Sequence, residues 1–159
     1  MRISILCVGK MRERYLRDAI AEYTKRISRF CVIEVIEVAD CEIPCRTNES
    51  IEERIKEKEG EELLRRIKPG SVTIALDIRG QMLDSCELAK KLDNYFVSGN
   101  SHINFVIGGS IGLGKNVLDK VDYRLSFSRM TFPHQLMRVI LLEQVYRSMK
   151  ILHGETYHK

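Results

Sequence analysis

The sequence predicts an α/β fold: a single domain with a mostly parallel sheet of five to six strands, flanked by helices. Short apolar runs rich in β-branched residues alternate with longer helical stretches, a pattern typical of a parallel sheet. The chain has 159 residues and shows no linker, internal repeat or low-complexity tract. A chain of this length without a boundary is expected to form one domain, residues 1–159.

Each element follows from its apolar spacing, from residues that begin or end helices, or from alternation of apolar and polar side chains. The predicted strands are residues 3–8, 32–38, 72–76, 103–107 and 123–128. The predicted helices are residues 11–29, 51–68, 84–96, 115–120 and 133–152. The polar stretch 39–50 is expected to be an exposed, mobile loop.

The last predicted helix is apolar on most of its circumference. Leu136, Val139, Leu142 and Tyr146 belong to an apolar set that covers far more than one stripe. Such a helix must be buried on most sides, but a terminal helix covers a sheet with only one face. A second copy of the chain is the simplest cover for the other face, so we expect a homodimer, with a fully buried helix in a monomer as the alternative.

Composition excludes several classes of protein. No apolar run is long enough to span a membrane, and the N-terminal run is too short for a signal peptide, so a cytoplasmic location without membrane contact is expected. The five cysteines form no secreted disulfide pattern, and the pair Cys41 and Cys45 lacks further zinc ligands nearby, so no metal site is predicted. The net charge of +4 permits contact with nucleic acid without requiring it.

The candidate site lies where strands end, because open α/β sheets bind ligands beyond the carboxyl ends of their strands. Four glycines follow the fourth predicted strand, at positions 108, 109, 112 and 114. Their spacing is neither the dinucleotide fingerprint nor a phosphate loop, and the glycines alone favour a tight strand-to-helix turn over a ligand site. The segment after the fifth strand is more specific. Phe127 and Phe132 bracket four residues before Pro133 and are expected to form a wall of an apolar pocket.

These segments resemble the RlmH family of the SPOUT superfamily, pseudouridine N3-methyltransferases of large-subunit (23S) ribosomal RNA. The resemblance covers essentially the whole chain. Its motifs are Ile-Leu-Cys-Val-Gly-Lys at 5–10, Phe-Val-Ile-Gly-Gly-Ser at 105–110, Leu-Ser-Phe-Ser-Arg-Met-Thr-Phe-Pro-His-Gln at 125–135, Met-Arg-Val at 137–139, Glu-Gln-Val-Tyr-Arg at 143–147 and Gly-Glu-Thr-Tyr-His-Lys at 154–159. Ile111 departs from the pattern, since a polar residue is expected there.

The resemblance implies a C-terminal trefoil knot whose loops hold S-adenosylmethionine. It also implies action on assembled ribosomes. The implied cofactor contacts are Leu76, Gly108, Phe127, Ser128, Arg129, Met130, Thr131 and Phe132. Because the cofactor is a sulfonium cation, the side chain of Arg129 is expected to point away from the sulfur.

The polar tail carries the implied catalytic residues. A proton must leave pseudouridine N3, and the resemblance implies His158 as the base, with Tyr157 as orienter, stacking platform or proton acceptor. Sequence alone favours a frayed terminus here. Two rival functions remain: a nucleotide-dependent oxidoreductase, which would bind NADH, and a ribosome-binding factor without activity.

Overall fold

The computed structural model describes residues 1–157, in which strands and helices alternate along the chain. The strands are β1 (Arg2–Val8), β2 (Val32–Val38), β3 (Val72–Met82), β4 (His102–Ile107) and β5 (Tyr123–Ser126). The helices are α1 (Arg14–Ile27), α2 (Glu49–Arg66), α3 (Ser85–Val97), α4 (Lys115–Leu118) and α5 (His134–Leu152). The strand order is β2-β1-β4-β3-β5 and all neighbouring strands are parallel. The predicted α/β fold is confirmed, with five strands; the trefoil knot stays a prediction.

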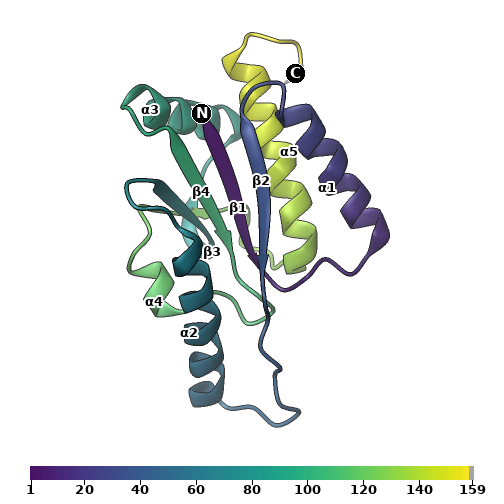
Figure 1. The fold of residues 1–159 in the computed structure, drawn as a ribbon, viewed down its shortest axis with the longest axis vertical. Coiled ribbons are helices and arrows are strands. Elements are labelled where there is room, and N and C mark those ends of the chain that lie inside the picture. Colours follow the sequence, from purple (N-terminus) through teal and green to yellow (C-terminus); the bar gives the residue numbers. More distant parts are fainter. Residues whose placement is uncertain (158–159) are drawn as a thin grey trace.

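The sheet is covered by helices on both faces (Figure 1). Alternate residues of β1 point to opposite faces: Ile3 and Ile5 pack with α1, α3 and α5, whereas Leu6 packs with α2 and α4. Because both faces are covered, the central strands are mostly apolar on both faces rather than alternating, with Ser4, Thr73 and Asn104 as buried polar exceptions. This is why the N-terminal apolar run is a buried strand.

Strand β3 is longer than predicted. The apolar run ends at Leu76, where the sequence predicts the end of the strand, but pairing with β5 resumes at Gln81 after a register shift. Gly80 packs against β5 so closely that a Cβ atom there would lie 2.6 Å from the carbonyl oxygen of Arg124. The extension mixes polar side chains with two exposed apolar ones, Ile78 and Met82, so it lacks the buried apolar run that predicts a strand.

The helix ends follow their capping residues. Asn48 accepts a hydrogen bond from the backbone N–H of Ile51 at the start of α2, and Asp84 with Glu87 forms a capping box at the start of α3. The predicted first and last residues of every helix lie within three residues of the observed ones. Within the described residues, no helix combines the length and apolar character that crossing a membrane requires.

Helix α5 lies between α1 and α3 on one face of the sheet (Figure 1). Leu141, Val145 and Met149 are fully buried against the sheet and its neighbours. Leu136 remains 37% exposed on the other side. The helix begins beside the carboxyl edge of the sheet and ends beside the amino edge, which places its two ends in different environments.

Candidate functional site

A hollow of about 570 Å³ lies at the carboxyl edge of the sheet. Three segments enclose it: the middle of β3, the glycine loop after β4, and the segment between β5 and α5. Its walls include Leu76, Gly108, Phe127, Ser128, Met130, Thr131 and Phe132. The structure therefore brings together seven of the eight residues predicted to contact a cofactor. The eighth, Arg129, is exposed and does not line the hollow.

The glycine loop folds back on itself to form one wall. Gly109 and Gly112 are bridged, and the N–H of Gly112 donates to the carbonyl of Gly109 at 3.1 Å. Gly112 has φ +85°, which favours glycine, and a Cβ atom on Gly108 would lie 2.6 Å from the carbonyl carbon of Gly112. From the sequence, Gly108 is interpreted as a residue that lets a ligand approach the backbone closely. The structure adds that the loop's own backbone already requires glycine there.

Two serines hold the segment after β5 in place. The hydroxyl of Ser126 contacts the carbonyl oxygens of Ile78 at 3.2 Å and Ser128 at 3.1 Å. The hydroxyl of Ser128 accepts a hydrogen bond from the backbone N–H of Met130 at 3.0 Å. These bonds tie the segment to β3 and shape its turn, so the apolar side chains of Phe127 and Phe132 reach the hollow from a fixed backbone.

The hollow has no cationic wall. Its lining residues include no Lys or Arg, and their ionisable side chains are Asp77 and His134. Asp77 accepts a hydrogen bond from the backbone N–H of Arg79 and lies 4.0 Å from the guanidinium of Arg124. Burial, assisted by the charge of Arg138, lowers the pKa of His134 below its ordinary value. At neutral pH the site therefore presents a carboxylate and a neutral imidazole, which suits a cationic ligand.

Arg138 fastens the start of α5 to the sheet. Its side chain is fully buried; the guanidinium donates to the carbonyls of Val8 and Gly9 at 2.6 and 2.8 Å, and to the carboxylate of Glu37 at 2.8 Å. The same carboxylate oxygen accepts from the backbone N–H of Met11. One side chain thus joins α5, the end of β1 and β2, directly behind the hollow.

We expect Arg138→Met to lower the free energy of unfolding by about 3 kcal/mol, since it leaves the buried carbonyls of Val8 and Gly9 without their donor. Urea unfolding monitored by circular dichroism measures this. The exposed Arg14→Met is the control, with an expected change within about 0.5 kcal/mol. Equal urea midpoints for the two variants would show that the hydrogen bonds of Arg138 contribute nothing to stability.

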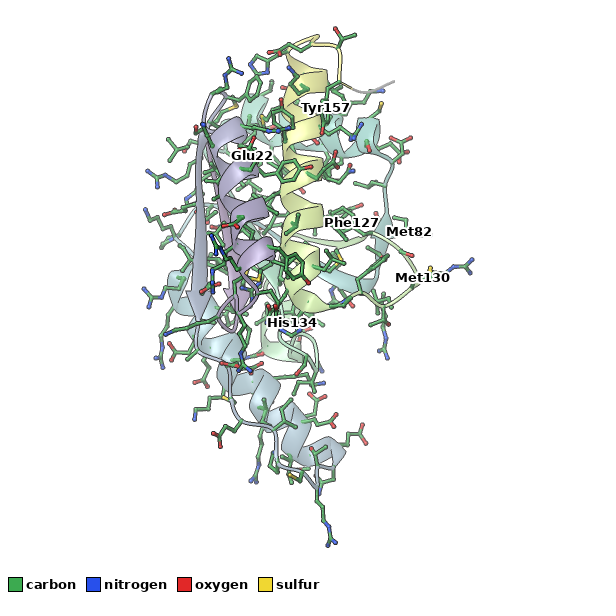
Figure 2. The ribbon with its side chains drawn as sticks, turned by 90° about the vertical axis from the view of Figure 1, so that its right-hand side faces the viewer. Glu22, Met82, Phe127, Met130, His134 and Tyr157 are labelled. Atoms are coloured by element: carbon green, nitrogen blue, oxygen red, sulfur yellow. The ribbon has the colours of Figure 1, made fainter. Side chains whose placement is uncertain are left out.

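Tyr157 lies far from the hollow in its own chain. Figure 2 shows Tyr157 and His134 at opposite ends of α5. The Tyr157 ring packs on Tyr146, with ring centroids 4.9 Å apart, and its hydroxyl lies 3.4 Å from the carboxylate of Glu143. The tail is therefore folded back on the helix as far as Tyr157. His158, the predicted base, lies outside the described residues.

Burial, followed by the nearby Glu143 carboxylate, raises the pKa of Tyr157 above its ordinary value. A phenol that is harder to ionise is a poor proton acceptor at neutral pH. Of the roles predicted for Tyr157, orienting or stacking therefore fits this environment better than accepting a proton.

Comparison with known proteins decides the family. A model described as "Predicted SPOUT methyltransferase" matches residues 1–158. The chain belongs to this family. Ribosomal RNA large subunit methyltransferase H of Acetivibrio thermocellus is 51% identical over 159 residues, and that of Clostridium beijerinckii is 52% identical; each alignment covers 100% of both chains.

A solved structure of a probable methylase family protein from Haemophilus influenzae Rd KW20 matches 99% of this chain and 70% of its own, with a TM-score of 0.55 and 14% identity. This likeness supports the fold alone. Membership of the SPOUT methyltransferase family removes the basis for the oxidoreductase alternative, which rested on the general strand-and-helix pattern.

The hollow also has residues in its wall that were not predicted as site residues from the sequence. Ser126, His134 and Met137 line the hollow, and none of them was among the eight predicted cofactor contacts. Ser126 follows Leu125 in a strand, and nothing in the sequence marked its side chain as part of the site. His134 was interpreted only as a first-turn helix residue, although its position directly after the aromatic segment indicated proximity to the site.

Proposed function

We propose that this chain transfers a methyl group from S-adenosylmethionine to N3 of a pseudouridine in large-subunit ribosomal RNA. It would act in the cytoplasm on assembled ribosomes. Relatives 51% and 52% identical over their full length are named ribosomal RNA large subunit methyltransferases. The observation that carries the proposal is the apolar hollow at the strand ends, which has no Lys or Arg in its wall.

The residues present fit this cofactor. The hollow, about 570 Å³, lies within the range of small-molecule sites. Leu76, Phe127 and Phe132 offer apolar surface, and Asp77 contributes a negative charge. When bound, S-adenosylmethionine supplies an electrophilic methyl group on a sulfonium. Transfer to a nitrogen anion removes both charges, so a site that excludes water favours the reaction.

The chain's own residues then position the acceptor and handle its proton. Holding the base nitrogen in line with the methyl group accounts for most of the expected acceleration, because orientation alone lowers a barrier by roughly 7–11 kcal/mol. His158 would take the N3 proton, with an unperturbed histidine titrating near neutral pH. Tyr157 would orient the base or stack on it.

Unless the tail moves a long way, it can reach the site only in a second copy of the chain. Helix α5 has 19 residues and is therefore about 28 Å long, and the tail leaves its far end. We infer that the chain forms a homodimer in which the tail of one subunit approaches the hollow of the other. Five exposed apolar side chains around the hollow and the start of α5 support this interface. They are Ile78, Met82, Met130, Phe132 and Leu136.

We expect sedimentation at micromolar concentration to give about twice the chain mass of 18.4 kDa. Met82→Lys with Leu136→Lys places two charges on the apolar surface and should shift the protein toward the monomer. A matched variant, Val97→Lys, alters a valine that is 79% exposed at the end of α3 and should leave the dimer intact. A monomeric wild type that still methylates would contradict the dimer.

Cofactor affinity should fall as the solution becomes acidic. The lowered pKa of His134 means that the folded protein favours the neutral imidazole. The stability that this group contributes is therefore full above the ordinary histidine pKa of 6.5 and is lost as the pH falls through the lower, folded value, whereas cofactor affinity declines only as the pH falls through that folded value. Below it, the His134 imidazolium adds a positive charge to the wall of the hollow, which would oppose the binding of a cation. Calorimetry at stepped pH measures the decline.

His134→Gln should abolish this pH dependence. His102→Gln is the matched control, because burial also lowers the pKa of His102, at the amino edge of the sheet. An unchanged decline in His134→Gln would assign the effect to another group.

The proposed function is tested by tritium transfer from labelled S-adenosylmethionine to unmodified ribosomes, followed by mapping of the labelled nucleotide. Label at N3 of a pseudouridine supports the proposal, and label at another position contradicts the assigned acceptor. Ribosome binding without incorporation would support the remaining rival, a binding factor without activity.

A further inference from the structure

A strip of basic side chains with one exposed aromatic lies on the turn between β1 and α1 and on the first residues of α1. It consists of Lys10, Arg12, Arg14 and Tyr15, which we call the turn strip. All four are exposed, and 68% of Tyr15 is accessible to solvent. An aromatic ring left this open is not explained by packing, and within a basic strip it matches the surfaces that bind single-stranded nucleic acid.

The turn strip adjoins the proposed active site. The backbone N–H of Arg12 donates to the side-chain carbonyl of Gln135, in the first turn of α5. Arg12 also borders a hollow of about 470 Å³ whose wall includes Gly109, Ser110 and His134. Those three residues also line the cofactor hollow. A polymer lying on the turn strip would therefore run directly past the cofactor hollow.

The turn that carries the strip is held rigid. Arg17 donates from one guanidinium nitrogen to the carbonyls of Met11 and Arg12, at 3.3 and 3.0 Å. The backbone N–H of Met11 donates to Glu37, which is itself held by Arg138. Because the backbone is fixed at both ends, the strip presents its charges without the entropic cost of ordering a loop.

The neighbouring carboxylates leave the strip's cations available. Asp40 lies 4.0 Å from the guanidinium of Arg12, and Asp18 lies 3.8 Å from that of Arg14. In each pair the charged atoms are almost 4 Å apart and both side chains are highly exposed. Such ion pairs contribute little free energy. Glu13 also lies in the turn, at the N-cap of α1, without a side-chain cap hydrogen bond. Within the described residues, Lys10 has no ion pair.

We propose that the turn strip is the surface that binds the RNA next to its target nucleotide, through phosphate contacts of Lys10, Arg12 and Arg14 and stacking of a base on Tyr15. The proposal rests on the proposed function for its RNA substrate. Phosphate contacts position a nucleic acid, and stacking on an aromatic ring tolerates any base. The strip would thus guide the strand, while the hollow and tail select the reacting base.

The test is fluorescence anisotropy with a short labelled single-stranded RNA, titrated at several salt concentrations. Arg12→Ala with Arg14→Ala removes two cations and leaves Arg17, which holds the turn. The double variant should bind about tenfold more weakly, and the slope of log affinity against log salt should become shallower by about 1.4, since each phosphate contact with a single strand contributes about 0.7. Arg65→Ala with Arg66→Ala removes the same charge from the end of α2 and should keep the wild-type slope.

Tyr15 separates stacking from charge. Tyr15→Ala should weaken RNA binding by about tenfold, whereas Tyr15→Phe keeps the ring and should remain within about twofold of the wild type. S-adenosylmethionine affinity should be unchanged in every variant, which also reports that the fold is intact. With ribosomes as substrate, the strip variants should raise KM and leave kcat near the wild-type value.

The outcomes distinguish the two proposals. If the wild type methylates ribosomes but the strip and α2 variants lose equal affinity and slope, the turn strip is not the RNA surface and the proposed function stands. If the wild type transfers no methyl group while the binding contrasts hold, the proposed function fails and the turn strip stands.

Discussion

Gly108→Ala is expected to reduce S-adenosylmethionine affinity by roughly ten- to a hundredfold. The added Cβ atom would lie 2.6 Å from the carbonyl carbon of Gly112, 2.7 Å from its oxygen and 2.9 Å from the backbone nitrogen of Leu113. All three are backbone atoms, so no side chain can swing aside. The loop must open, and overpacking of this kind costs about 1–3 kcal/mol, where each 1.4 kcal/mol is a factor of ten in affinity.

Calorimetry with the cofactor measures this loss, and Gly108→Val should bind more weakly still. Gly99→Ala is the control. It places a Cβ at φ +92°, with no atom within 4 Å, near the end of α3 and away from the hollow. That strain should cost about 1 kcal/mol of stability without touching the cofactor site. Wild-type affinity in a folded Gly108→Ala protein would place the cofactor elsewhere.

The positions of the strands could be predicted because their sequence pattern has a direct physical cause. The run from Ile3 to Val8 is apolar on both faces, and the structure buries all of it beneath helices. The site's location followed from the same reasoning, since the carboxyl ends of parallel strands must meet at one edge. What failed was the length of β3, because pairing with β5 resumes at Gln81 and Met82, which are exposed and need no buried apolar pattern.

Buried charge could not be predicted from periodicity. Arg138 lies within an apolar helix and would be expected on an exposed face, yet its side chain is fully buried. Its burial depends on Glu37 and the carbonyls of Val8 and Gly9, which are more than a hundred residues away in the sequence. Only the three-dimensional arrangement brings those acceptors together. The same holds for His134, whose lowered pKa has burial as its main cause.

The role of the C-terminal tail can be argued only from the family resemblance and the geometry of the structure together. Resemblance supplied Tyr157 and His158, but no local pattern placed them near the glycine loop. In its own chain Tyr157 packs on Tyr146 at the end of α5 opposite to His134 (Figure 2). A role in catalysis therefore requires either a large movement of the tail or a neighbouring subunit.

Deleting residues 157–159 should leave cofactor binding nearly intact while methyl transfer falls by at least about a hundredfold, because a positioned base contributes roughly 10²–10⁴-fold. Stability should fall only modestly, since Tyr157 packs at the edge of the core. Tritium incorporation and calorimetry separate the two effects. His158→Gln keeps the length of the tail and should reproduce most of the loss if His158 is the base, whereas Lys159→Ala should not.

A mixed dimer then decides whether the site is shared between subunits. One chain lacks the tail, and the other carries Gly108→Val, so each parent homodimer is inactive for a different reason. In a composite site, the intact glycine loop of the first chain meets the intact tail of the second, and one of the two sites in the dimer survives. If each chain instead uses its own tail, both sites are broken. Activity regained on mixing the two folded parents therefore requires the tail to cross the interface, and continued inactivity of a verified mixed dimer would rule out the composite site.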